Sequence, residues 1–285
     1  MNKDLGFMLY CHEDYAKVQH FQSYHRFHSD HIVFCVECID NKAICLPKSP
    51  IGGFTCFNGR KSDFLQFYEK SEKSLTQNGI SSLEITLPPH YYTGVPDRSW
   101  LEQLGFSERV SEIAHYIPIN GPLWEKIHTM QQRKLKQTPT FDLSLVNVSE
   151  LRSVYDFIAQ CRKNQGLEIN MDFEILERLF RTFPDRYQIF TAERNGTLLA
   201  AAIMVIPIEG ITYYFLPATA PAYKTESPMV HLIAYLYQYY QERGFQFIDL
   251  GISSVNTAPQ KSLITFKERM GGIRTTRSTF IKSLQ

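Results

Sequence analysis

A strand-like hydrophobic pattern occurs twice in this chain, at residues 79–87 and again 165 positions later at residues 244–252. Each copy follows an amphipathic helix pattern and begins just after a glycine of the kind that ends helices. Each is followed by a short helix pattern closing on glycine and by a final strand pattern, at residues 100–106 and 115–119 in the first copy and 266–272 and 278–282 in the second. This shared order predicts two copies of one α/β unit, each of about 140 residues.

The second half predicts two helices, three strands and a further helix ahead of the repeated strand. The helices are expected at residues 150–162 and 173–183, with Ser149 and Asp172 as N-caps, and at 228–243, where Ser227-Pro228 is a typical helix start. The strands are expected at residues 187–194, 197–206 and 211–215, with a hairpin turn at Asn195-Gly196.

The first half has a similar but less regular pattern. Strands are expected at residues 6–11, 32–39 and 42–46, with a hairpin turn at Asp40-Asn41, and a helix is expected at 62–77. Residues between 12 and 31 form a polar, histidine-rich segment. A helix with a basic end, at residues 122–137, connects the two halves.

Composition describes a globular protein without a strong overall charge. The chain has 285 residues, is 44% hydrophobic and carries a net charge of +1, so no global field attracts nucleic acid or an acidic membrane. No apolar run is long enough for a membrane span, and the charged N-terminus is unlike a secretory signal. We therefore expect a cytoplasmic protein with no membrane span.

Five of the six cysteines lie within the first 56 residues, close to several histidines. A zinc site would explain such a cluster. Cys35 and Cys38 belong to a strand pattern, however, and residues three apart on a strand point to opposite faces. No second cysteine pair follows at metal-ligand spacing. We expect buried, reduced thiols and no metal site.

Several short strings follow one another in a defined order in the second half. They are residues 123–127 with Arg133-Lys134, the hairpin 189–196 with the small-residue strand 199–203, Tyr213-Tyr214, residues 247–251 with Asn256, and residues 266–272. With the element order, these strings resemble the GNAT acyltransferase fold, and the tandem copies resemble the Fem-type aminoacyltransferases. The resemblance covers residues 120–282 through motifs and residues 1–119 through architecture alone.

The resemblance implies an α/β (α+β) fold with two tandem GNAT-like domains related by a pseudo-two-fold axis. Each domain would contain a mixed, mostly antiparallel sheet flanked by helices. Residues 1–120 would form a degenerate N-terminal domain. Residues 121–285 would form the C-terminal domain, including the linker helix at 122–137.

The resemblance also implies a notch between the fourth and fifth strands of the second domain, where backbone N–H groups would bind an acyl donor. Beside it, Asp249 would accept a proton from an amine, or would be a structural acid that caps the turn at Gly251. Tyr213 or Tyr214 would protonate the leaving group, and strand alternation leaves one of them facing the core.

The expected substrate-binding residues are Lys267, Arg162, Asn164, Asn256 and Ser254. Two of them have a simpler interpretation. Lys267 would then be a solvated helix lysine, and Arg162 would complement the negative end of a helix.

A second candidate site lies in the first half, where glycines and cations precede a helix. Its residues are Gly52, Gly53, Gly59, Arg60 and Lys61, and the expected helix cap is Ser62 or Asp63. Such a loop suits the phosphate of a cofactor, and the alternative is a flexible turn with a solvated basic tip. The matching loop of the second half, residues 217–227, contains no glycine.

These features predict an N-acyltransferase that moves an acyl or aminoacyl group to an amine acceptor, a small molecule or a peptide-like compound, in the cleft between domains. The alternative is a catalytically degenerate GNAT-fold binding protein, which the glycine-free loop favours. No cofactor is expected to bind tightly; acyl-CoA or aminoacyl-tRNA would be the co-substrate, with local basic patches holding the tRNA. Glu84 and Asp249 match in the repeat, so equivalent burial would make Asp249 a scaffold residue.

Overall fold

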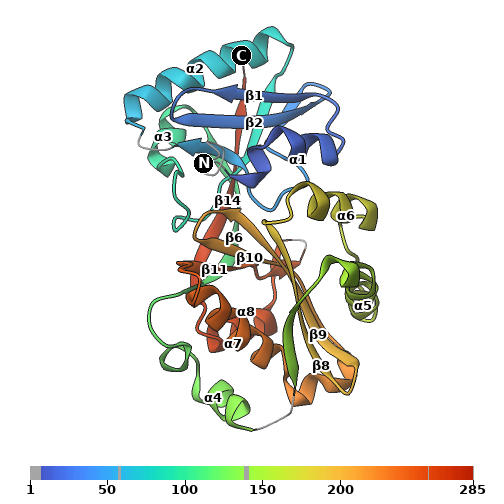
Figure 1. Ribbon diagram of the computed structural model, residues 1–285. Coiled ribbons are helices and arrows are strands. Elements are labelled where there is room, and N and C mark those ends of the chain that lie inside the picture. Colours follow the sequence, from blue (N-terminus) through green and yellow to red (C-terminus); the bar gives the residue numbers. More distant parts are fainter. Residues whose placement is uncertain (1–7, 57–58, 138–140, 256, 285) are drawn as a thin grey trace. The chain divides into compact units, whose positions relative to one another are not determined.

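The computed structural model describes residues 8–56, 59–137, 141–255 and 257–284 (Figure 1). The chain divides into two compact units. Unit 1 comprises Met1–Ala114, Ser254–Pro259 and Thr275–Gln285, and unit 2 comprises His115–Ser253 and Gln260–Arg274. Because the units interleave along the chain, the domain boundary at residues 120/121 stays a prediction.

Unit 2 contains a mixed sheet flanked by helices, as the sequence predicts. Its strands are β7 (Asp142–Val146), β8 (Tyr187–Arg194), β9 (Thr197–Ile208), β10 (Ile211–Thr219) and β11 (Phe247–Ile252). Its α-helices are α4 (Thr129–Lys136), α5 (Leu151–Lys163), α6 (Phe173–Thr182), α7 (Pro228–Gln241) and α8 (Lys261–Arg269). The strand order is β6-β11-β10-β9-β8-β7; β10 and β11 are parallel, and β7 to β10 are antiparallel.

Two helices cover opposite faces of this sheet. Helix α5 packs against β9 and β10, and α7 packs against β8, β9 and β10. Strand β9 is almost continuously buried because both of its faces are covered. The hairpin between β8 and β9 turns at Asn195-Gly196 with positive φ at both residues, which confirms the sequence prediction.

Unit 1 also contains a mixed sheet with helices. Its elements are η2 (Leu9–Cys11), α1 (Glu13–Val18), β1 (Tyr24–His28), β2 (Ile32–Ile39), β3 (Lys42–Ile44), β4 (Gly53–Cys56), α2 (Lys61–Gln77), β5 (Ser82–Thr86) and α3 (Arg98–Gln103). The strand order is β1-β2-β3-β5-β14, with β3 parallel to β5 and β4 paired with β2. Aromatic residues fill the core, and the Phe34 and Phe54 rings are stacked 4.2 Å apart.

The repeated order of elements is present in both halves of the chain. It runs α2-β5-α3-β6 in the first copy and α7-β11-α8-β14 in the second, where β6 is Ser107–Pro118 and β14 is Ile273–Ser283. The last strands are exchanged between the copies. In unit 1, β14 pairs with β5 from Thr279↔Thr86 to Ser283↔Ser82. In unit 2, β11 has β6 as its neighbour.

Several local elements differ from the sequence predictions. The strand expected at residues 6–11 is the 3₁₀ turn Leu9–Cys11 over its described part, and residues 12–31 contain α1 and β1. The linker helix is split into the 3₁₀ turn Leu123–Glu125 and α4, because His128 Nδ1 accepts the Met130 N–H at 3.1 Å and begins a new helix. Ser149 lies inside the 3₁₀ turn Val148–Glu150 rather than capping α5.

The cysteines are free, and five of the six are buried, as expected. Burial raises the pKa of the Cys35 and Cys45 thiols, which keeps them protonated. The described residues include no group of three or more potential metal ligands placed to share an ion. None of the described helices combines the length and the apolar character needed to cross a bilayer.

Candidate functional site

The candidate site in unit 2 lies where β10 and β11 part. The two strands are paired over only three residues each, from Ile211↔Phe247 to Tyr213↔Asp249. Strand β10 then continues to Thr219 and β11 to Ile252, and no further pair joins them in the described part of the chain. Parallel strands that separate leave backbone N–H and C=O groups without the partner strand. The strands part at the position of the notch that the GNAT resemblance implies. Binding of an acyl donor there stays a prediction.

Asp249 lies at the last pair before the strands part. Its side chain is 3% exposed, and its Oδ1 accepts the Gly251 N–H at 2.7 Å. Gly251 has a φ of +68°, so the carboxylate closes a turn that favours glycine. The capping role considered from the sequence is therefore present.

Tyr213 shares this position in the sheet. It is in register with Asp249, so both side chains point to the same face. A Cβ atom added at Gly251 would lie 3.2 Å from the Tyr213 Oη, which shows that the phenol packs directly over the turn that Asp249 closes. Gly251 thus leaves room for the Tyr213 ring.

Tyr214 points to the opposite face. Its hydroxyl donates to Met229 Sδ at 2.6 Å, its side chain is 7% exposed, and burial raises the pKa of its phenol. Tyr214 belongs to the core under α7. Of the tyrosine pair, Tyr213 is the residue on the site face.

Arg162 contributes a cation at the end of α5. Burial lowers the pKa of its guanidinium, while the nearby Tyr213 phenol acts in the opposite direction. Arg162 forms no ion pair with any described carboxylate. A partly desolvated guanidinium without a carboxylate attracts an anionic group of a ligand.

Lys267 is held inside the fold rather than solvated. Its side chain is 4% exposed, and Nζ donates to the Gly251 and Ile252 carbonyl oxygens at 3.0 and 2.6 Å. The ammonium therefore binds the end of β11 next to Asp249. A substrate contact by Lys267 stays a prediction.

A group of polar side chains around buried His115, which the sequence analysis did not identify, lies in unit 2. His115 Nδ1 is 3.0 Å from the Ser253 hydroxyl, and both side chains are 0% exposed. His115 Nε2 is 3.8 Å from Glu268 Oε1, which is too long for a hydrogen bond. Burial, and then the Lys267 charge, lower the pKa of His115 to about 4, so the imidazole is neutral. No sequence signal links positions 115, 253 and 268.

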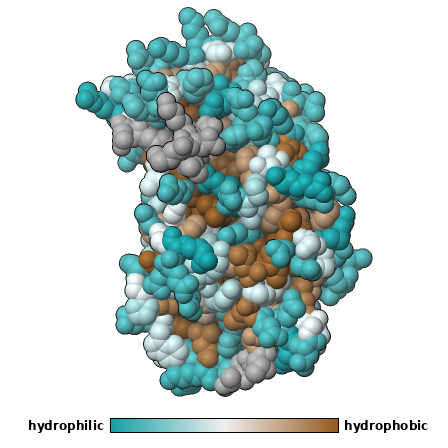
Figure 2. All heavy atoms as spheres, in the orientation of Figure 1, coloured by the Kyte–Doolittle hydropathy of each residue, from teal (hydrophilic) through white to brown (hydrophobic). Residues whose placement is uncertain are grey.

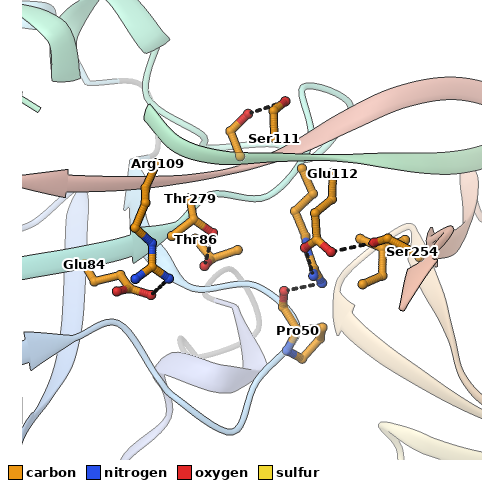
Figure 3. A network of polar contacts seen from close by, with 12 residues as sticks. Pro50, Glu84, Thr86, Arg109, Ser111, Glu112, Ser254 and Thr279 are labelled. Atoms are coloured by element: carbon orange, nitrogen blue, oxygen red, sulfur yellow. Dashed lines mark hydrogen bonds and ion pairs between the residues drawn. The ribbon is translucent and has the colours of Figure 1, made fainter. Parts of the chain in front are cut away.

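Two other predicted substrate-binding residues, Asn164 and Ser254, have hydrogen-bond partners within the protein. Asn164 is exposed at the C-cap of α5, where its Oδ1 accepts from Gln160 Nε2 at 3.0 Å. Ser254 belongs to unit 1, where its hydroxyl donates to Glu112 at 2.5 Å (Figure 3). Glu112 also accepts from Arg277 at 2.7 Å, and Arg277 donates to the Pro50 carbonyl at 2.9 Å. Asn256 lies outside the described residues.

Gly52 and Gly53, predicted to bind a cofactor phosphate, form hydrogen bonds within unit 1. The Gly52 N–H donates to the Thr86 carbonyl at 2.8 Å, and the Gly53 N–H donates to Cys45 Sγ. A Cβ at Gly53 would lie 2.7 Å from Ile85, so this glycine allows close strand packing. Both N–H groups are thus used within the protein.

Gly59, Arg60 and Lys61 lie at the start of α2. Arg60 is the N-cap without a side-chain hydrogen bond, and Lys61 is the first helical residue, so neither Ser62 nor Asp63 caps the helix. Arg60 and Lys61 are exposed. A contact between these cations and a cofactor phosphate stays a prediction.

Comparison with known proteins supports this reading of the fold. Residues 128–258 match the family model described as an acetyltransferase (GNAT) domain. The structure is similar to that of FemX, with a TM-score of 0.70, 11% identity, and coverage of 95% of this chain and 91% of FemX. Residues 128–258 are thus similar to a GNAT acetyltransferase domain, and the chain shares the fold of FemX.

Two further structures share this fold. L-PGS from Bacillus licheniformis has a TM-score of 0.60 and 13% identity, with 98% of this chain and 93% of that chain covered. A tandem GNAT protein from the clavulanic acid biosynthesis pathway has a TM-score of 0.52 and 10% identity, with 90% and 81% covered. Among curated proteins, no sequence matches this chain. At these identities, the similarity describes the fold alone.

Proposed function

We propose that unit 2 transfers an acyl or aminoacyl group to an amine. The observation that carries the proposal is the parting of β10 and β11 directly after the Tyr213↔Asp249 pair, with both side chains on one face. GNAT domain similarity over residues 128–258 supports the same reaction class. The cytoplasmic location remains a prediction.

The proposed reaction needs a base, an acid and a stabilised carbonyl oxygen. The amine nitrogen attacks the carbonyl carbon of the donor and forms the new C–N bond, while Asp249 accepts the amine proton. Backbone N–H groups of the parted strands stabilise the oxygen as negative charge develops. The bond to the leaving sulfur or oxygen then breaks, and Tyr213 gives its proton to the leaving atom.

Arg162 would bind an anionic group on a substrate beside this centre. The partly buried guanidinium has no carboxylate partner among the described residues, and it lies close to Tyr213. The donor would be acyl-CoA or an aminoacyl-tRNA, and the acceptor a small or peptide-like amine.

A second candidate function is ligand binding without catalysis. In favour of it, the segment before α7 contains no glycine and is partly helical, unlike the glycine-rich loop that binds a phosphate. The 3₁₀ helix Pro221–Glu226 directly precedes α7, and Arg194 donates two hydrogen bonds to Glu226, the one from Nη2 to Oε1 at 3.1 Å. Ser227 adopts a left-handed conformation, and its buried hydroxyl has no hydrogen-bond partner among the described residues.

The deciding experiment compares Asp249→Asn with the unchanged protein in an amide-formation assay, using acetyl-CoA and aminoacyl-tRNA as donors and a panel of amines. Asparagine keeps an oxygen that can accept the Gly251 N–H but cannot take a proton. We expect the rate to fall by about 10²–10⁴-fold. Asp156→Asn, on the exposed surface of α5, is the matched control and should retain full activity.

Thermal shift measurements with the same donors separate the two functions. A donor that stabilises the protein and is turned over supports the transferase. Stabilisation without turnover by any amine supports the binding protein, and an unchanged rate in Asp249→Asn would restrict Asp249 to capping the Gly251 turn.

A further inference from the structure

Positive charge is concentrated in the segment between β6 and β7. Residues 121–137, which include the 3₁₀ turn Leu123–Glu125 and helix α4, contain three lysines and one arginine but only one acid, Glu125. This segment therefore carries a net charge of +3, whereas the whole chain carries +1. Because the rest of the chain is slightly negative, an attraction to an anionic surface has to come from a local region of this kind.

Helix α4 packs onto unit 2 with one side and presents cations on the other (Figure 1). On the inner side, Gln131 is 2% exposed, and Leu135 packs against the hydrophobic core of unit 2. Arg133 and Lys136 are exposed and three residues apart, so they are neighbours on the outer side of the helix. The outer side of α4 is therefore basic, and the helix itself contains no acid.

Two exposed apolar side chains lie beside these cations. Trp124 is 40% exposed and Met130 is 41% exposed. The Trp124 carbonyl accepts from Gln132 Nε2 at 2.8 Å, and Lys136 Nζ lies 5.0 Å from the centroid of the Trp124 ring, so the turn is held against α4. Arg269 of α8 adds a further cation, because its Nη1 lies 3.5 Å from Met130 Sδ. In the view of Figure 2, apolar side chains interrupt the polar surface of unit 2.

The cations of this surface are not neutralised by the protein. Arg133, Lys136 and Arg269 form no ion pair with a carboxylate in the ranges that the structure describes. Elsewhere in unit 2, by contrast, Arg181 pairs with Glu177 at 3.1 Å. Unpaired cations next to exposed apolar side chains are complementary to an acidic bilayer, where lysine and arginine contact the headgroups and apolar side chains enter the interface.

We propose that the α4 face, formed by Trp124, Met130, Arg133, Lys136 and Arg269, binds the surface of a membrane that contains acidic phospholipids. The three cations contact headgroup phosphates, and the two apolar side chains leave water at the interface. A nucleic acid would engage the cations but offers Met130 no apolar surroundings, and Lys136 already lies over the Trp124 ring on which a base would stack. The proposal does not depend on the proposed acyl transfer.

The test measures co-sedimentation of the full chain with vesicles of phosphatidylcholine, alone or mixed with phosphatidylglycerol. We expect binding to the mixed vesicles that added salt weakens, and little binding to the neutral vesicles. A variant with both Arg133→Gln and Lys136→Gln should bind the mixed vesicles about 30-fold more weakly, because each cation near an anionic surface contributes about fivefold. The matched control combines Lys70→Gln and Lys73→Gln, which have the same spacing at exposed positions of α2, and should bind like the unchanged protein. Thermal melts establish that both variants fold.

Tryptophan fluorescence tests the apolar part of the contact separately. The chain has two tryptophans, so a Trp100→Phe variant reports on Trp124 alone. Mixed vesicles should shift its emission to shorter wavelengths, because the ring leaves water. The proposal is overturned by absent or equal binding to the two kinds of vesicle, by equal binding of the two double variants, or by an unchanged Trp124 emission. Binding to RNA but not to vesicles, lost in the α4 double variant, would make this face a nucleic-acid site instead.

Discussion

Glu84 and Asp249 occupy matching positions in the two repeats, but their surroundings differ. Glu84 accepts from Arg109 at 2.9 Å, and its side chain is 27% exposed (Figure 3). Asp249 is buried and closes the Gly251 turn. The two acids therefore do not share one structural role. Both acids lie in the last register pair of two parallel strands, Glu84 opposite Ile44 and Asp249 opposite Tyr213.

His115 should make the stability of the protein depend on pH. Because its pKa falls to about 4 in the folded chain, from 6.5 when unperturbed, the unfolded chain binds a proton first as the pH decreases. The neutral ring stabilises the fold above about pH 6.5. That contribution, up to about 3 kcal/mol, is lost as the pH falls towards 4. Denaturant titrations from pH 7.5 to 4 measure it.

The control for this prediction is a pair of glutamine variants. His115→Gln should lose this part of the pH dependence, whereas His31→Gln, at an exposed position, should follow the unchanged protein. Identical slopes for His115→Gln and the unchanged protein would show that the His115 ring does not titrate differently on folding.

At the scale of elements, Lys267 on α8 fixes the end of β11. Lys267→Met keeps most of the side-chain length but removes both bonds to the Gly251 and Ile252 carbonyls. We expect the free energy of unfolding to fall by roughly 3 kcal/mol, because two buried acceptors lose a charged donor. Lys261→Met, at the exposed start of the same helix, should change it little. Equal unfolding midpoints for the two variants would contradict this role.

The elements with a strong local signal were predictable. Pro228 begins α7 at its first position, and Asn195-Gly196 turns the β8–β9 hairpin. The failures have local causes. His128 gives no stop signal in a helical pattern, yet its ring caps α4. The polar strand β1 is defined by its pairing with β2, from Tyr24↔Glu37 to His28↔Val33, rather than by its own pattern.

At the scale of the whole molecule, the exchanged strands predict that residues 1–120 do not fold alone. This fragment contains β5 but lacks β14, and with it the buried Phe280 and the Arg277 partner of Glu112. We expect no cooperative thermal transition by circular dichroism. Joining residues 273–285 to its C-terminus through a flexible linker should restore one. A cooperative transition in the unextended fragment would show that β14 is dispensable for unit 1.

The sequence by itself determined the repeat, the class of fold and the position of Asp249, because hydrophobic periodicity, helix-ending glycines and turn residues act over a few neighbouring positions. Only the tertiary structure decided which tyrosine faces the site, that Lys267 binds the end of β11, and that His115 lies against Ser253. It also decided the strand exchange. These features depend on contacts between residues far apart in the chain, and the local sequence pattern around one residue does not indicate which distant residue it contacts.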